Sequence, residues 1–554
     1  MRTDSASAVF VGARVGVRWA ALLLLALGVA APAAARMNVV VIMTDDQRFD
    51  TLSKMPNVLE KLAARGVTFN AAYVPTPLCS PSRATLFSGG FATRNTGVLN
   101  NNPPNGGATL FNDSENFGLV MQQAGYQTFY AGKWINNYVA LGNYIPPGWN
   151  RFVGRQYDIS REDWSNGIKY VNGTTGATSA PGTRFTLWGK YLTYYERDEA
   201  LDFLSRVKTG QPFFLVWSTA APHRASTPAP GDEALFANFV YRGRGVSEVD
   251  LSDKPRWVRA RRPAIDDEAI RDQLRSLQSV DRSIASIVAK LGAIGQLSNT
   301  VIVFTSDNGF HWGEHNRLWG KQLPYEESIR VPLLVVMPGV GARTEKRLVS
   351  TSLDLAPTFY QLAGVTRRTE GRSLVPLLTT AGIPWRNELF FESYSINSTG
   401  NALWAAARQG KWKYIKYWTG EEELYDLASD PYELESRHAD PTLASLKSDL
   451  AAKTAQRIGL AIVPVSSFPA AKVDARYVYQ LKTWGGVAPY TWKLESGALP
   501  PGLTLNGSTG LISGTAKTTG SYRFSVRVTD SSFASQAERR RTFVTRTMSI
   551  NAAL

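Results

Sequence analysis

Five short apolar runs, rich in β-branched and aromatic residues, recur along the chain, and each stops abruptly at polar residues or a turn. They cover residues 38–44, 126–131, 213–219, 300–306 and 331–336. Continuous apolar runs of this length are typical of strands buried on both faces. Between them, residues 57–65 and 269–291 repeat apolar positions with a helical period. This alternation predicts an α/β fold in which a mostly parallel sheet is sandwiched by helices.

Polar side chains follow four of these runs within a few residues. They are Asp45 and Asp46, then Lys133, then His223, and finally Asp307 with Asn308. In open α/β sheets ligands bind beyond the carboxyl ends of the strands, so these groups should converge on one edge. Each alone could be a helix cap or a solvated side chain. Together they predict an active site.

The oxygen-rich part of this set suggests a metal. Clustered carboxylate and amide oxygens without thiolates favour Ca²⁺ or Mg²⁺ over zinc. The candidate ligands are Asp45, Asp46, Asp307 and Asn308. Carboxylates packed this closely would repel one another unless a cation lies between them.

The N-terminal segment predicts export. Arg14 and Arg18 precede the apolar run 19–29, and alanines lead to residue 35. This pattern is typical of a secretory signal peptide over residues 1–35, so we expect a secreted or periplasmic protein without stable membrane insertion after cleavage. The run is shorter than the roughly 20 apolar residues of a membrane-spanning helix. A lipid anchor would need a cysteine at the cleavage site, where there is none.

Export makes the cysteine content unusual, because the 554 residues contain only one cysteine, Cys79. Secreted proteins generally pair cysteines in disulfides. A buried thiol acting as a small apolar group is one alternative, but the neighbours Ser80 to Arg83 are not typical core residues. Ser80 as cap and Pro81 in the first turn predict a helix start here. Its N-terminus, with Arg83, Lys133 and Lys321, would form a cationic cradle for a tetrahedral oxyanion.

The segment Cys79-Ser-Pro-Ser-Arg83, followed by residues 84–89, resembles the signature of the type I sulfatases of the alkaline phosphatase-like superfamily. The resemblance runs from about Asn38 to about Arg457. It includes residues 305–309, 320–321, 325–332, 354–358 and 423–431. Residues 132–138 and 146–149 are most similar to the N-acetylglucosamine-6-sulfatase branch.

This resemblance implies a chemistry for position 79. In the family a maturation enzyme oxidises the cysteine to Cα-formylglycine, whose hydrate binds the metal, here Ca²⁺ or Mg²⁺, and attacks sulfur. Asp45, Asp46, Asp307 and Asn308 would join position 79 as ligands, with Asp307 as proton acceptor. Arg83, Lys133 and Lys321 would neutralise the sulfuryl group, while His223 or Lys321 protonates the departing oxygen. The second hydroxyl of the hydrate then expels sulfate.

The chain departs from the commonest family pattern after its third strand. Many members have Lys-x-His there, whereas this chain has Lys133-Trp-Ile followed by Asn136. The base for the elimination step therefore stays open. His311 or His315 could serve, and Asn136 could instead only bind sulfate.

The C-terminal third changes character twice. Residues 404–427 predict short antiparallel strands, and residues 442–457 predict a helix, which fits the smaller sulfatase subdomain. After about residue 463 the period becomes two with turn signals between runs, a β-sandwich pattern that resembles bacterial Ig-like modules. The expected domains are the signal peptide 1–35, a catalytic domain 36–395, a C-terminal subdomain 396–462 and an Ig-like module 465–554. The module is a spacer or a glycan or cell-surface attachment device.

The formal net charge of +15 is consistent with a polyanionic substrate such as a sulfated glycan. A nucleic-acid partner is not expected, because no binding motif accompanies the basic residues. The leading hypothesis is a sulfatase that acts on a sulfated small molecule or glycan. The alternatives are a phosphonate monoester hydrolase or phosphodiesterase of the same superfamily, and a non-catalytic glycan-binding surface protein.

Overall fold

The structure is a computed structural model that describes residues 36–103, 105–156, 168–246, 248–259, 265–315, 320–394, 403–463, 468–531 and 543–554. The expected signal peptide, 1–35, lies outside the described residues. The expected domain boundaries at 395/396 and 465 lie outside them too. Among the described residues, no helix combines the length and the apolar character that crossing a membrane requires.

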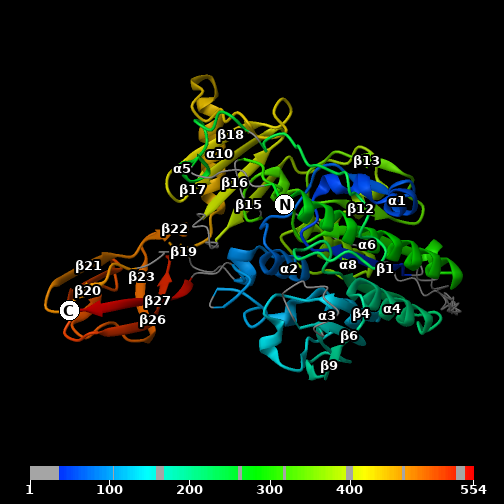
Figure 1. Ribbon diagram of the computed structural model, residues 1–554, viewed down its shortest axis with the longest axis horizontal. Coiled ribbons are helices and arrows are strands. Elements are labelled where there is room, and N and C mark those ends of the chain that lie inside the picture. Colours follow the sequence, from blue (N-terminus) through cyan, green and yellow to red (C-terminus); the bar gives the residue numbers. More distant parts are fainter. Residues whose placement is uncertain are drawn as a thin grey trace, which may run out of the picture. The chain divides into compact units, whose positions relative to one another are not determined.

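A ten-stranded mixed sheet forms the centre of the N-terminal part (Figure 1). In spatial order its strands are β13 (Arg343–Glu345), β2 (Val67–Phe69), β12 (Leu333–Val336), β11 (Thr300–Ser306), β1 (Asn38–Thr44), β10 (Phe213–Ser218), β4 (Gln127–Lys133), β6 (Arg151–Arg155), β7 (Ile168–Gly173) and β9 (Thr183–Leu187). Strands β11, β1, β10, β4 and β6 are parallel neighbours. Strand β12 runs antiparallel to β11, so the expectation that the run 331–336 joins the parallel set is wrong.

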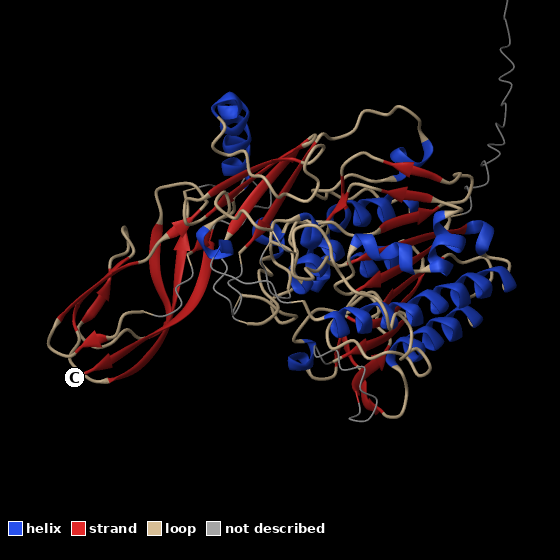
Figure 2. Cartoon of the chain, turned by 45° about the horizontal axis from the view of Figure 1, so that its top comes forward, coloured by secondary structure: helices blue, strands red, loops and turns tan. Residues whose placement is uncertain are grey.

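Helices cover both faces of this sheet, as Figure 2 shows. The α-helices of the described residues are α1 (Pro56–Val58), α2 (Cys79–Ser88), α3 (Phe117–Gln123), α4 (Leu192–Ser205), α5 (Arg256–Arg259), α6 (Asp267–Ala293), α7 (Glu326–Ile329), α8 (Thr351–Leu362), α9 (Val375–Thr379) and α10 (Ala444–Arg457), of which α10 packs on the C-terminal sheet instead. Val39 and Val41 of β1 pack in one core cluster with α2, α3 and α8. Val40 and Ile42 face the opposite cluster, which includes α4 and α6. This alternation of a fully buried strand confirms the predicted α/β fold.

Helix α2 begins at Cys79, two residues earlier than a Ser80 cap would allow. Leu78 is the N-cap and gives no side-chain cap, so the expected capping role of Ser80 is wrong. The Ser80 hydroxyl instead donates to Asn136 Oδ1 at 3.1 Å. Residues 79–87 are all buried, because the helix packs between the sheet and α8. The expectation that Ser80 to Arg83 avoid the core is therefore also wrong.

The C-terminal subdomain contains the predicted antiparallel strands. Its sheet is formed by β15 (Glu388–Ser393), β16 (Trp404–Gln409), β17 (Trp412–Tyr417) and β18 (Glu422–Asp426). Helix α10 packs on this sheet through Leu450. Strand β15 pairs with β16 although it precedes residue 396.

Residues 468–531 and 543–554 form two further small sheets around one core. The strands are β20 (Ala471–Lys472), β27 (Phe543–Ala553), β26 (Gly520–Thr529) and β23 (Thr491–Gly497) in one sheet, and β21 (Arg476–Gln480), β25 (Leu511–Thr515) and β24 (Leu503–Leu505) in the other. Buried Trp492, Ile512 and Phe524 lie between them. The arrangement confirms the predicted β-sandwich character of this region.

Short strand pairs complete the fold. They are β3 (Ala72–Tyr73) with β14 (Val349–Ser350), β5 (Tyr144–Ile145) with β8 (Ala180–Pro181), and β19 (Ala461–Ile462) with β22 (Thr483–Trp484).

We expect the stability of the protein to depend on pH through Glu392 of β15. Burial raises its pKa from 4.5 to about 7, although Thr93 donates to both of its oxygens. Between these two pH values the unfolded chain loses a proton that the folded chain keeps, so stability falls as pH rises through this window. Glu392→Gln should remove this loss and stabilise the protein at about pH 8 by on the order of 1–3 kcal/mol, with no gain at about pH 4.

Chemical denaturation at both pH values measures this effect. Glu388→Gln, an exposed change on the same strand, is the matched control and should show no such pH dependence. An equal effect of Glu392→Gln at both pH values would contradict the prediction.

Candidate functional site

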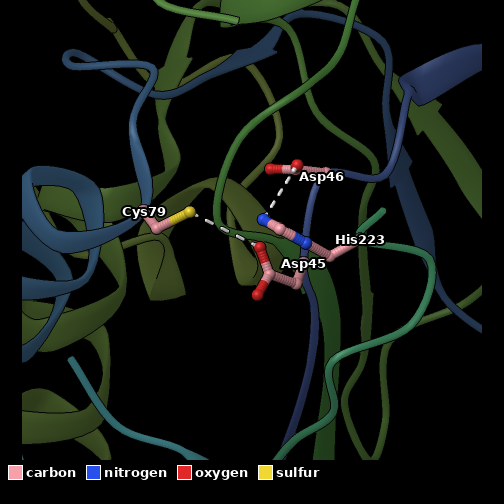
Figure 3. A group of neighbouring side chains, drawn as sticks. All are labelled: Asp45, Asp46, Cys79 and His223. Atoms are coloured by element: carbon pink, nitrogen blue, oxygen red, sulfur yellow. Dashed lines mark hydrogen bonds and ion pairs between the residues drawn. The ribbon is translucent and has the colours of Figure 1, made fainter. Parts of the chain in front are cut away.

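The polar groups predicted at the strand ends lie together in the structure. Asp45 and Asp46 follow β1, and Asp307 and Asn308 follow its neighbour β11. Lys133 ends β4, while His223 follows β10, which lies between β1 and β4. Because these strands are parallel neighbours, their carboxyl ends meet at one edge. Helix α2 delivers Cys79 to the same place (Figure 3).

Cys79 is fully buried within this group. Its Sγ is 3.6 Å from Asp45 Oδ1 and accepts from Lys321 Nζ at 2.7 Å. Burial raises the pKa of the thiol to about 12, although Lys133 and Lys321 favour the thiolate. In this arrangement the unmodified thiol is neutral near pH 7 and a weak nucleophile.

Hydrogen bonds connect the segments that carry the buried carboxylates Asp46 and Asp307. Asn308 Nδ2 donates to Asp46 Oδ1 at 2.6 Å, and the Asp46 amide donates to Asp307 Oδ1 at 3.1 Å. Asp46 has φ of 65°, a left-handed conformation that Asp and Asn tolerate better than most residues. The two segments after β1 and β11 therefore fix each other's geometry.

Three cations balance the carboxylates of Asp45, Asp46 and Asp307. Lys133 Nζ lies 2.5 Å from Asp45 Oδ2, Lys321 pairs with Asp46, and Arg83 Nε donates to Asp307 Oδ2 at 2.8 Å. All three pairs are at least largely buried. A pair of this kind is costly to break, because the charge left behind stays buried.

The carboxylates of Asp45 and Asp307 differ in their pKa. Burial raises the pKa of Asp45, but Lys133 and then other cations overcome this and hold it well below its usual value. Burial, followed by the Asp45 carboxylate, raises the pKa of Asp307 to about 6. The site thus separates a strongly ionised carboxylate from a more basic one.

Arg83 is committed to holding the site together. Besides Asp307, its Nη1 donates to the Lys133 carbonyl and to Ser218 Oγ, both at 2.7 Å. Its Nη2 lies 3.6 Å from Asp45 Oδ2. Ser218 also donates to the Lys133 carbonyl. Ser218 is a site residue that was not predicted, although a polar residue at the end of an apolar strand is a signal that could have found it.

The histidines occupy different places. His223 Nε2 lies 3.6 Å from Asp46 Oδ2, and burial lowers the pKa of the imidazole. His311 lies beside Glu314, with Nδ1 3.9 Å from Glu314 Oε2, and is not part of the group around Cys79. His315 is held between Glu248 and Glu327, and these two carboxylates overcome burial to raise its pKa to about 10.

The residues at this edge suit a hard divalent cation. Asp45, Asp46, Cys79 and His223 each offer a ligand atom within 4.8 Å of the others. Asn308 Oδ1 is buried and accepts no hydrogen bond from the described residues, so a cation would satisfy it. Carboxylate and amide oxygens are the ligands that Ca²⁺ and Mg²⁺ prefer.

Three family patterns match the chain. The sulfatase pattern matches residues 37–365, the pattern described as "N-sulphoglucosamine sulphohydrolase, C-terminal" matches residues 313–458, and an Ig domain pattern matches residues 460–545.

Curated relatives share about a third of their aligned residues with this chain. Human N-acetylglucosamine-6-sulfatase is 32% identical over 401 residues, which cover 67% of this chain and 71% of the relative. An extracellular sulfatase Sulf-1 homologue of Caenorhabditis elegans is 32% identical over 380 residues, or 64% of this chain. The match spans about half, 52%, of that longer relative.

Solved structures share the fold. A protein in complex with its substrate D-glucosamine-2-N,6-O-disulfate superposes with a TM-score of 0.65 at 23% identity, covering 76% of this chain and 97% of the other. Phosphonate monoester hydrolase of Agrobacterium radiobacter gives a TM-score of 0.54 at 25% identity, covering 76% and 94%. The matched patterns, the relatives and the fold agree, and this chain belongs to the sulfatase family.

Proposed function

We propose that the protein hydrolyses a sulfate monoester carried by a sugar or sulfated glycan, with the nucleophile formed at position 79. The observation that carries this proposal is the burial of Cys79 among three carboxylates and three cations at the start of α2. The names of the relatives, which include N-acetylglucosamine-6-sulfatase, support a sugar substrate.

The nucleophile forms at position 79, and the metal ligands beside it assist its deprotonation. Oxidised to formylglycine by a maturation enzyme and hydrated, Cys79 supplies the hydroxyl that attacks sulfur. Asp45, Asp46, Asp307 and Asn308 would hold Ca²⁺ or Mg²⁺, which supplies positive charge that favours the deprotonated hydroxyl. The raised pKa of Asp307 makes it a better proton acceptor than Asp45, whose pKa is lowered.

The cations divide the remaining work. Arg83 fixes Asp307 and the Lys133 carbonyl, so it acts mainly by positioning. Lys133 and Lys321 lie nearer to the thiol and would balance charge on the transferring sulfuryl group. The contact between Lys321 Nζ and Cys79 Sγ supports this role of Lys321 in balancing the sulfuryl charge.

Proton delivery to the departing alcohol falls to His223 or Lys321. Both contact Asp46, and His223 is the more exposed of the two, with 22% of its side chain accessible against 12% for Lys321. His311 lies apart from the group, which leaves it a weaker candidate for the elimination step. Asn136 is bonded to Ser80, and because a carboxamide does not take up a proton near neutral pH we assign it to sulfate binding.

The cellular setting follows from the N-terminal segment. We propose export with removal of residues 1–35, which makes the protein secreted or periplasmic. Two relatives are named as extracellular sulfatases. The maturation enzyme and a sulfated glycan are then the expected partners. The division into 36–395, 396–462 and 465–554 stays part of this proposal.

The second candidate is a phosphonate monoester hydrolase, because that enzyme's structure shares the fold and 25% of its residues. Its substrate carries a second ester group, which needs its own pocket. We expect kcat/KM to be higher for an aryl sulfate than for an aryl phosphate or a phosphonate monoester. Parallel rates on the three compounds, with protein co-expressed with a maturation enzyme, measure this preference. A preference for the phosphonate would overturn the proposal.

A further inference from the structure

Two adjacent cavities lie away from the catalytic residues. The first, of about 860 Å³, is lined by Ser88 to Phe91 at the C-terminal end of α2, and the second is about 380 Å³. They share the lining residues Phe91, Glu370 and Arg457, so they are immediate neighbours. We call this surface the arginine groove.

The groove is strongly basic. Its basic side chains are Arg94, Arg368, Arg372, Arg386, Arg408, Lys453 and Arg457, against the acidic Glu115, Glu370 and Glu388. Each acidic side chain already has a cationic partner. Glu370 pairs with Arg94 at 3.1 Å, Glu388 pairs with Lys453 at 2.8 Å, and Glu115 pairs with Arg367. The negative charges of the groove are therefore neutralised by ion pairs within the protein.

Three arginines remain for a ligand. Arg368, Arg372 and Arg457 are exposed, and within the part of the chain that the structure describes none of them forms an ion pair. Arg457 ends α10, where a helix C-terminus favours a cation, but this explains only one of the three. Arg368 faces the first cavity, Arg372 the second, and Arg457 both.

We propose that the arginine groove is a second binding site, an exosite that takes a sulfated segment of a saccharide chain. A planar guanidinium offers a fork of donors that matches two oxygens of a tetrahedral oxyanion. Three such groups spread over two neighbouring cavities fit a ligand that carries several sulfates in a row better than a single ion. The choice of a sulfated ligand rests on the proposed function.

The arginine groove lies apart from the candidate catalytic residues around Cys79. Cys79 and Ser88 are nine helical steps apart in α2, about 14 Å along the axis. None of the groove residues belongs to the group around Cys79. The exosite should therefore raise affinity for long substrates and leave the hydrolysis of small sulfate esters unchanged.

The test measures binding without turnover. The full chain is expressed without a maturation enzyme and titrated into a fluorescent heparin-derived hexasaccharide, followed by anisotropy. The triple variant Arg368→Glu, Arg372→Glu, Arg457→Glu should weaken binding by at least about tenfold, because three exposed charge contacts become repulsive. The matched control Lys472→Glu, Arg476→Glu, Arg523→Glu makes the same charge change at exposed positions of the C-terminal sandwich and should bind within about twofold of the parent.

The outcomes separate this proposal from the function on which it rests. Equal losses in both triple variants, no loss in the groove variant, or equal binding of a desulfated hexasaccharide would each overturn the exosite. The matured groove variant should hydrolyse an aryl sulfate at the parent rate. If aryl sulfate turnover is normal but the groove binds nothing, only the exosite fails. If the groove binds and no matured protein turns over the ester, only the proposed function fails.

Discussion

Replacing Cys79 with alanine should lower hydrolysis of an aryl sulfate by at least about 10³-fold, because the nucleophile is formed at that position and loss of a nucleophile removes most of the catalysis. The side chain is fully buried, so the change also leaves a small void. A cost of about 1 kcal/mol in stability is expected, and the fold should remain. Initial rates and a thermal melt of matured protein measure the two effects separately.

Ser82→Ala is the matched control for this change. Ser82 is buried in the same turn of α2, but its hydroxyl bonds to Ser352 Oγ at 2.9 Å instead of facing the carboxylates. It should lose a similar amount of stability and keep activity within a few-fold. A mass spectrum of the peptide that contains residue 79 completes the test. Active enzyme with an intact thiol, or full activity of Cys79→Ala, would refute the proposed nucleophile.

Much of the central sheet could be predicted from the sequence, because a strand buried on both faces leaves a continuous apolar run. The runs that became β1, β10, β11 and β4 also end in the polar groups that now lie together. The direction of each strand was harder to predict than its position in the sequence. The run at β12 looks like the others but is antiparallel to β11, since the direction of a strand depends on its connections and not on its own composition.

The burial of residues 80–83 could not be predicted from local composition. Serine and arginine are usually exposed, yet Arg83 is fully buried because Asp307, Ser218 and the Lys133 carbonyl satisfy it. Two of these partners lie more than a hundred residues away in the chain. His311 follows Asp307 and Asn308 closely in sequence, yet it lies beside Glu314 and is not part of the group around Cys79.

Asp46→Asn should abolish a metal-dependent rise in the unfolding temperature. Ca²⁺ or Mg²⁺ bound to the native state at 100 times its dissociation constant would stabilise the protein by about 2.7 kcal/mol, which is a rise of several degrees. Asparagine keeps the shape of the side chain and tolerates the φ of 65°, so the backbone should not change. It removes one of the charges that hold the cation, and activity should fall by at least about 10²-fold with the metal affinity.

Asp281→Asn provides the comparison. Asp281 is another buried carboxylate, which accepts from the backbone amides of Asn57 and Val58 at the start of α1, away from the group around Cys79. Its replacement should cost stability both with and without the ion, while the metal-dependent rise and the activity persist. Differential scanning calorimetry with chelator, with Ca²⁺ and with Mg²⁺ distinguishes the two variants. Because Asp46 also pairs with Lys321, the Asn variant could lose stability for that reason alone, so the decisive quantity is the difference between melts with and without the ion. If that difference is the same in Asp46→Asn as in the parent, Asp46 is not a ligand.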